Sequence, residues 1–132
     1  AFARAPFWGY KNPEMKTFVA RYKKRFGAYP NEWAIMSYSA VETWAAAVQK
    51  TKSLNGDKVS KALEGTTVPT IRGRIKIRAC DHQAEVPEFV GTIAPKADKT
   101  VGHKLWNPEV IVAQPAKTMI TCQESLALRR AG

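Results

Sequence analysis

The chain has 132 residues, 45% of them hydrophobic, which is typical of a folded domain and argues against a disordered segment. No apolar run reaches the roughly 20 residues of a membrane-spanning helix, and the first residues do not resemble a signal peptide, although a targeting segment removed earlier would leave no trace. Lys and Arg total 21 against 11 for Asp and Glu, so the net charge is +10. This excess favours anionic partners such as nucleic acid, an acidic membrane or a carboxylate ligand, without choosing among them.

The first predicted element is an amphipathic helix that begins after Asn12 and ends at Gly27. Asn12 can cap it, Pro13 suits the first helical position, and Gly27 suits the stop. Five apolar side chains recur at helical spacing and form one stripe: Met15, Phe18, Val19, Tyr22 and Phe26.

Two further helices are predicted. One begins near Glu32 and is apolar on nearly all sides, so we expect it to be buried on more than one side. An alternative start lies at Ser39, which with Glu42 would form a capping box. A short third helix follows, with Asp57 as its candidate cap and Gly65 as its stop.

After the third helix the sequence period changes. Residues 74–79 alternate between basic and apolar side chains, which predicts a strand with one buried face. Residues 86–93 form a second strand-like run, and residues 80–85 have the length of a hairpin connection. We interpret residues 94–115 as a loop with one short strand, and the tail after Cys122 is too short to support a prediction beyond a turn of helix.

The order of these motifs resembles the closing part of a known family. The series NPEMKTFVARYKKRFGAYPNEWAIMSYSAVETWAAAVQK, DKVSKALEG, TIRGRIKIRACDHQ and PEFVGTI is similar to type I periplasmic solute-binding proteins of ABC importers, the group that includes the Leu/Ile/Val-binding proteins. The similarity covers about residues 7–113 and depends on the whole series rather than on one motif. Many relatives carry an Asp after the helix tyrosine, where this chain has Ser39, so no acid at this point can shape the cleft.

The resemblance implies an α/β chain that is part of a bilobed fold, with three helices followed by a β-hairpin and an irregular C-terminal segment. Residues 1–30 would be part of the C-terminal lobe, residues 31–94 part of the N-terminal lobe, and residues 95–132 the crossover and the tail that returns to the C-terminal lobe. Because family members are considerably longer, the chain would be a fragment, and most of the family's ligand-binding residues would lie upstream of it.

The same resemblance implies a non-enzymatic, periplasmic substrate-binding component of an ABC importer that uses no cofactor and no metal. Its solute would be a branched-chain amino acid or a small aromatic or other carboxylate, bound in the cleft between the lobes and delivered to a membrane permease. The remaining part of the same protein, or a complementary chain, would complete the lobes. Three aromatic residues are candidate ligand contacts, with core packing as the alternative: Trp8, Tyr10 and Tyr38.

The adjacent Cys80, Asp81 and His82 raise the question of a reactive or metal site. On an extended strand successive side chains point to opposite faces, so adjacency does not bring a base to the thiol. A zinc site needs about four ligands, and only His103 and Cys122 remain as soft donors. We therefore expect the end of a strand with polar turn residues. Two cysteines alone leave the compartment open, but the family resemblance implies a disulfide between Cys80 and Cys122.

The basic, aromatic segment of residues 21–26, RYKKRF, supports an alternative function, a basic binding module for nucleic acid or another acidic partner. Tyr22 and Phe26 lie on the apolar stripe, so we expect them to pack inward rather than to stack on bases. A solvated helix face is the preferred interpretation, and we expect no nucleic-acid partner.

Overall fold

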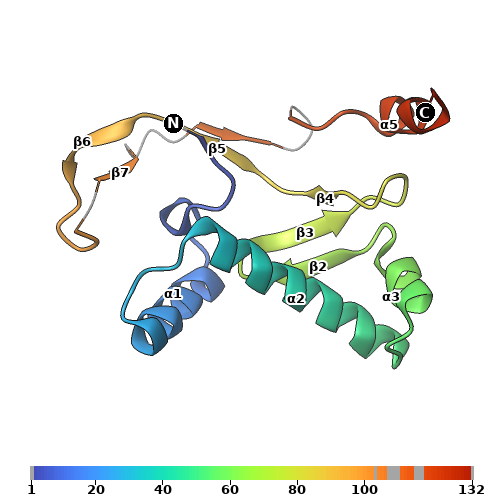
Figure 1. Ribbon diagram of the computed structural model, residues 1–132, viewed down its shortest axis with the longest axis horizontal. Coiled ribbons are helices and arrows are strands. Elements are labelled where there is room, and N and C mark those ends of the chain that lie inside the picture. The colour runs from blue at the N-terminus through green and yellow to red at the C-terminus, as the bar shows by residue number, and fades with distance from the viewer. Residues whose placement is uncertain (1, 103, 107–110, 115–117, 132) are drawn as a thin grey trace.

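The computed structural model describes residues 2–102, 104–106, 111–114 and 118–131, and it contains helices and short strands in three small sheets (Figure 1). The helices are η1 (Phe7–Gly9), α1 (Pro13–Phe26), α2 (Glu32–Thr51), α3 (Gly56–Leu63) and α5 (Cys122–Ala131). Among the residues described, none of these helices has both the length and the apolar character that crossing a membrane requires.

All strand pairings described are antiparallel. One sheet has the order β1-β5-β8, formed by Phe2–Ala3, Glu88–Val90 and Ile111–Ala113. A second has the order β2-β3-β4, formed by Thr67–Thr70, Gly73–Ile77 and Ala84–Glu85, and a third pairs β6 (Ile93–Ala97) with β7 (Lys104–Trp106). Helix α2 packs against β2 and α3, while β6 and β7 lie at the opposite end of the molecule from α5 (Figure 1).

Local capping explains where the helices begin and end. Gly27 ends α1 with a φ of 68°, a conformation that glycine adopts without strain. The Asn31 side chain accepts a hydrogen bond of 2.9 Å from the backbone N–H of Ala34, so the predicted start of α2 near Glu32 is confirmed. The alternative start at Ser39 is wrong, because this residue is buried inside the helix.

The predicted cap of the third helix is also wrong. Asn55, rather than Asp57, accepts the capping hydrogen bond, from the backbone N–H of Lys58 at 3.1 Å. Asp57 instead lies in the first turn of α3, where its negative charge interacts favourably with the positive end of the helix dipole.

The predicted hairpin is only partly confirmed. Strand β3 forms as expected and pairs with β4 through Lys76 and Glu85, but its longer partner is β2, a strand that was not predicted. The predicted strand of residues 86–93 is divided: β5 leaves this sheet to pair with β1, and β6 begins at Ile93. Pro87 lies between β4 and β5 and has no N–H to donate, so one continuous ladder cannot pass through it.

The core joins α1 and α2 to the turn between β2 and β3 and to β5. Its buried members are Ala5, Tyr10, Met15, Phe18, Ile35, Ile71 and Phe89. The α/β fold class is confirmed, but two expectations about its parts are wrong. The C-terminal segment is not irregular, because α5 forms there. Helix α2 is not buried on several sides, because Trp33 and Val41 are 69% and 61% exposed in the described structure.

Candidate functional site

A concave surface lies where η1 meets the segment that leads into α2, and we call it the crossover hollow. Its volume is about 310 Å³, and it is lined by Ala5, Pro6, Phe7, Trp8, Tyr29, Pro30, Asn31 and Glu32. Gly9 explains how η1 fits there, because a Cβ at this position would lie 2.6 Å from the ring of Phe89. The close approach of η1 to β5 therefore requires glycine.

Aromatic contacts hold the wall of the crossover hollow. The ring of Phe7 stacks on Tyr29 with 5.1 Å between centroids, and Trp8 meets Phe7 edge to face at 5.0 Å. The indole N–H of Trp8 is buried and finds no acceptor among the described residues. A buried donor without a partner is costly, so this N–H would be stabilised by an acceptor from outside the described residues.

Two lysine side chains contact residues that line the hollow. Lys11 donates from Nζ to the backbone carbonyl of Trp8 at 2.9 Å, and Lys23 Nζ lies 4.4 Å from the Tyr29 ring centroid and 3.1 Å from its hydroxyl. Glu32 is the acidic residue of the lining, and it accepts from the backbone N–H of Arg4 at 3.1 Å. The two ammonium groups favour an anionic group at this surface.

Tyr10, the second predicted ligand contact, lies in the core. Its hydroxyl accepts from Arg72 Nε at 3.1 Å and donates to the carbonyl of Arg4 at 3.4 Å. Burial raises the pKa of Tyr10 above its ordinary value, and the nearby Arg72 cation opposes that rise. Tyr10 thus ties the turn after β2 to the segment before η1.

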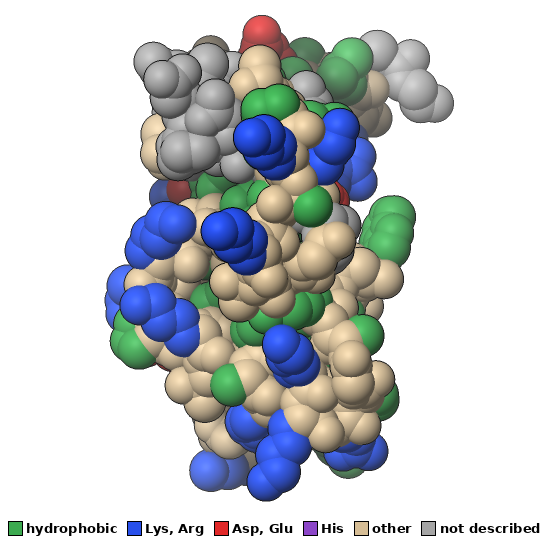
Figure 2. Space-filling model, turned by 90° about the vertical axis from the view of Figure 1, so that its left-hand side faces the viewer, with side chains coloured by type: hydrophobic (Ala, Val, Ile, Leu, Met, Phe, Trp, Pro, Cys, Tyr) green, Lys and Arg blue, Asp and Glu red, His purple; other side chains and the backbone are tan. Residues whose placement is uncertain are grey.

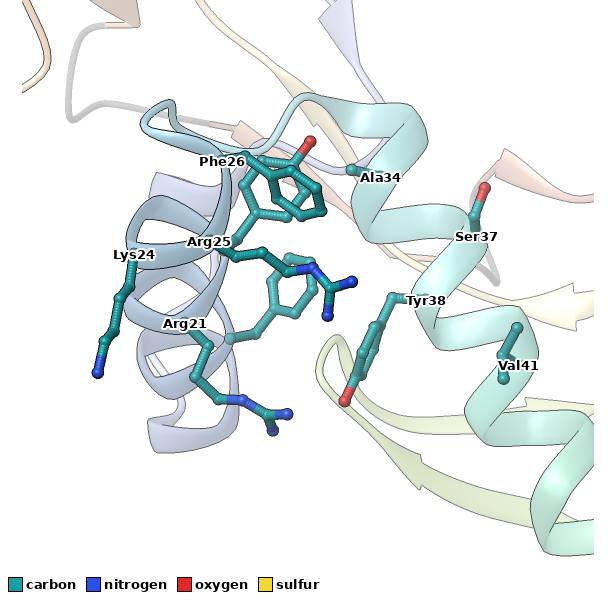
Figure 3. Close-up of a pocket in the computed structure, with 10 residues that line it drawn as sticks. Arg21, Lys24, Arg25, Phe26, Ala34, Ser37, Tyr38 and Val41 are labelled. Carbon is teal, nitrogen blue, oxygen red and sulfur yellow. The ribbon is translucent and has the colours of Figure 1, made fainter.

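Tyr38, the third predicted contact, lines a different surface, which we call the α1/α2 groove. It has a volume of about 790 Å³, and its lining is Phe18, Arg21, Tyr22, Lys24, Arg25, Phe26, Ala34, Ser37, Tyr38 and Val41 (Figure 3). The Tyr38 ring packs on Phe18 with 4.7 Å between centroids. The structure therefore does not bring the three predicted contacts together. The expectation that Phe26 packs inward is wrong, since it is 59% exposed.

Cys80, Asp81 and His82 each have a different partner. Cys80 forms the expected disulfide with Cys122, across a Cα–Cα distance of 5.8 Å, and His82 Nε2 lies 3.3 Å from a Glu64 carboxylate oxygen. Cys80 and Asp81 lie in a turn, so the predicted extended-strand geometry is wrong at these residues. The described residues contain no group of three or more His, Cys, Asp or Glu that could hold a metal, and His103 lies outside them.

Sequence reasoning missed the ionic contacts beside the disulfide. Arg78 and Asp81 form a buried, bidentate ion pair, and Arg78 Nη1 also donates to the carbonyl of Ile120 at 2.6 Å. The Arg78 guanidinium holds the pKa of the Asp81 carboxyl well below its usual range. From α5, Arg129 donates to the backbone carbonyl of Asp81 at 3.3 Å. The disulfide and these contacts together attach α5 to the β3–β4 turn.

Comparison with known proteins identifies the family. The sequence profile of the periplasmic binding protein family matches residues 1–99, whereas none of the curated proteins matches this sequence. An ABC-type branched-chain amino acid transporter from Rhodopseudomonas palustris is similar over 92% of this chain and 32% of its own, with 27% identity and a TM-score of 0.77. An ABC transporter protein from the same species is 37% identical over 57% of this chain and 23% of its own, with a TM-score of 0.53.

A third structure extends the likeness of fold. The solute-binding protein of an ABC transporter from Rhodopseudomonas palustris, in complex with 3,4-dihydroxybenzoic acid, is 24% identical over 83% of this chain and 30% of its own, with a TM-score of 0.66. The chain thus spans about a third or less of the length of these structures. The matched family is one of non-enzymatic binding proteins. The chain belongs to the periplasmic binding protein family.

Proposed function

We propose that the chain is part of the solute-binding component of an ABC importer, working in the periplasm and delivering its solute to a membrane permease. The observation that carries the proposal is the similarity over 92% of the chain to an ABC-type branched-chain amino acid transporter. The proposed solute is a branched-chain amino acid, and small aromatic carboxylates are the second class, as in the relative bound to 3,4-dihydroxybenzoic acid.

The proposed mechanism is non-covalent. A solute that contacts both lobes binds the closed arrangement more tightly than the open one, so binding shifts the population toward closure. This chain supplies one wall of the cleft. At that wall the indole N–H of Trp8 donates to a solute carboxylate, which would satisfy a donor that has no other partner among the described residues. Ligand contact by Tyr10 and Tyr38 stays a prediction.

The division into lobes at residues 30 and 94 also stays a prediction. Met15 of α1 and Ile35 of α2 belong to one buried cluster, which supports a second arrangement in which both helices lie in the same lobe. In that arrangement the chain would cross between lobes before α1, in the segment that contains η1 and Trp8. This crossing would place the crossover hollow next to the cleft.

Calorimetric titration tests the proposal. The protein is the product of the complete reading frame that contains this chain, and the ligands are leucine, isoleucine, valine and 3,4-dihydroxybenzoate. Trp8→Phe keeps an aromatic ring but removes the N–H, so affinity should fall roughly tenfold or more, the effect of one hydrogen bond to a charged group. Trp33→Phe, at an exposed residue of α2 that does not line the hollow, is the matched control and should bind normally. Equal affinity of both variants would exclude Trp8 as a donor to the solute.

A further inference from the structure

The α1/α2 groove exposes several large apolar side chains to solvent. Its lining includes Phe26, Tyr38 and Val41, which are 59%, 38% and 61% exposed. The apolar surface continues along α2 through Trp44, which is 49% exposed. Single exposed apolar residues are ordinary, but a contiguous set of aromatic and aliphatic side chains marks an interaction surface.

The sequence of α2 supports the same conclusion. This helix of 20 residues is apolar on nearly all sides, yet its buried residues are only Ile35, Ser39 and Ala47 within the described structure. A helix with so little polar surface is normally covered on more than one side. The cover of its groove-facing side is therefore not supplied by the described residues.

The charges around the groove restrict what can cover it. Its lining contains the three cations Arg21, Lys24 and Arg25 and no acidic residue. The guanidinium groups of Arg21 and Arg25 extend toward α2, whereas Lys24 points away from the groove (Figure 3). On the side of the molecule seen in Figure 2, Lys and Arg side chains are numerous and Asp and Glu side chains are sparse. An occupant with acidic residues at its edge fits this rim best.

A second copy of this chain does not fit that description. It would bring the same basic rim and another net charge of +10 to the contact, so like charges would face each other. The matched ABC-type branched-chain amino acid transporter offers a different occupant. The similarity extends over 92% of this chain but over only 32% of the transporter protein. The fold of the transporter protein therefore contains much additional polypeptide.

We propose that the α1/α2 groove is an internal packing surface, which receives a segment from the remainder of the periplasmic-binding-protein fold carried on the same polypeptide. The segment presents apolar side chains to Phe26, Tyr38 and Val41 and carboxylates to Arg21 and Arg25. The proposal rests on family membership and not on the identity of the solute.

Hydrogen–deuterium exchange tests the proposal without any solute, so its result can be interpreted whether or not solute binding is found. The 132-residue chain is compared with the product of the complete reading frame that contains it. Backbone amides of residues 22–26 and 34–41 should exchange about tenfold or more slowly in the longer product. Equal exchange in the two proteins, or a complete product that adds no polypeptide to this chain, would overturn the proposal.

Paired variants separate covering of the groove from general damage. In the longer product, Val41→Glu and Arg25→Glu should lower the melting temperature by several degrees, whereas in the 132-residue chain, where these side chains already face solvent, they should have little effect. The matched controls are Leu54→Glu, at a residue that is 76% exposed outside the groove, and Lys24→Glu, which should be tolerated in both proteins. A dimer of the 132-residue chain that protects the same amides would contradict the proposal by making a second copy the occupant.

Discussion

The disulfide between Cys80 and Cys122 should be a main contributor to the stability of the C-terminal part of the chain. The two residues are separated by 42 positions, and the chain-entropy relation for a loop of this length gives about 13 cal/mol/K, or about 4 kcal/mol at 25 °C. With an unfolding entropy of about 2.1 cal/mol/K per residue over 132 residues, this loss corresponds to a fall of about 14 °C in the melting temperature.

The double variant Cys80→Ser, Cys122→Ser removes the cross-link without leaving a single reactive thiol. Urea titration followed by circular dichroism should show the loss of about 4 kcal/mol, and wild-type protein in reductant should match the variant. Two results would refute the reasoning. One is free thiols in wild-type protein purified without reductant. The other is a double variant that has the same urea midpoint as the wild type while α5 unfolds in a separate transition.

Three further predictions concern the core, the ion pair and a helix end. Ile35→Ala should destabilise the chain by about 2 to 5 kcal/mol, because Ile35 is fully buried, whereas Val41→Ala in the 132-residue chain should change stability by less than about 0.5 kcal/mol; urea midpoints of both variants test this. The pKa of Asp81 is lowered in the folded protein, so the ionised carboxylate stabilises the fold above the ordinary Asp pKa of about 4, and this stabilisation is lost as the pH falls below that value. Asp81→Asn should therefore make the free energy of unfolding depend less on pH between about pH 5 and 2. An equal pH dependence in the variant and the wild type would contradict this. Gly27→Ala should cost about 1 kcal/mol in thermal melts, because its φ is 68° with free space around a new Cβ, while Gly56→Ala, which has the same space without a positive φ, should be neutral or stabilising.

The helices could be predicted from sequence because their signals are local. The apolar repeat, the cap at Asn31 and the left-handed Gly27 all act within a few residues of the helix that they define. Exposure of α2 could not be predicted in the same way. The apolar pattern of α2 predicts that other residues pack on it. Local sequence does not specify which residues these are or whether they belong to this chain.

Strand pairing could not be predicted as well as the helices because paired strands are distant in sequence. β2 is only four residues long and contains Pro69, which is tolerated because β2 lies at the edge of its sheet. β5 pairs with β1, 86 or more residues away, so its departure from the predicted hairpin could not be read from the hairpin itself. Pro87 was the local signal that could have divided the strand.

Candidate ligand contacts could be chosen from sequence by residue type, but where their side chains lie could not be predicted. The aromatic content before α1 drew attention to Trp8, and its role as a ligand contact stays a prediction. Only the three-dimensional structure reveals that its N–H is buried without a partner among the described residues, while the Tyr10 hydroxyl is already paired with Arg72. The attachment of α5 through Arg78 and Asp81 depends on a turn conformation that the alternation of β3 does not specify.

We propose above that the chain is part of a solute-binding protein for an ABC importer. The most direct measurement is calorimetric titration of the complete gene product with leucine, isoleucine, valine and 3,4-dihydroxybenzoate at neutral pH. We expect saturable binding of at least one of these solutes with one site per molecule. Absence of binding across this panel by a folded product that unfolds cooperatively would contradict it.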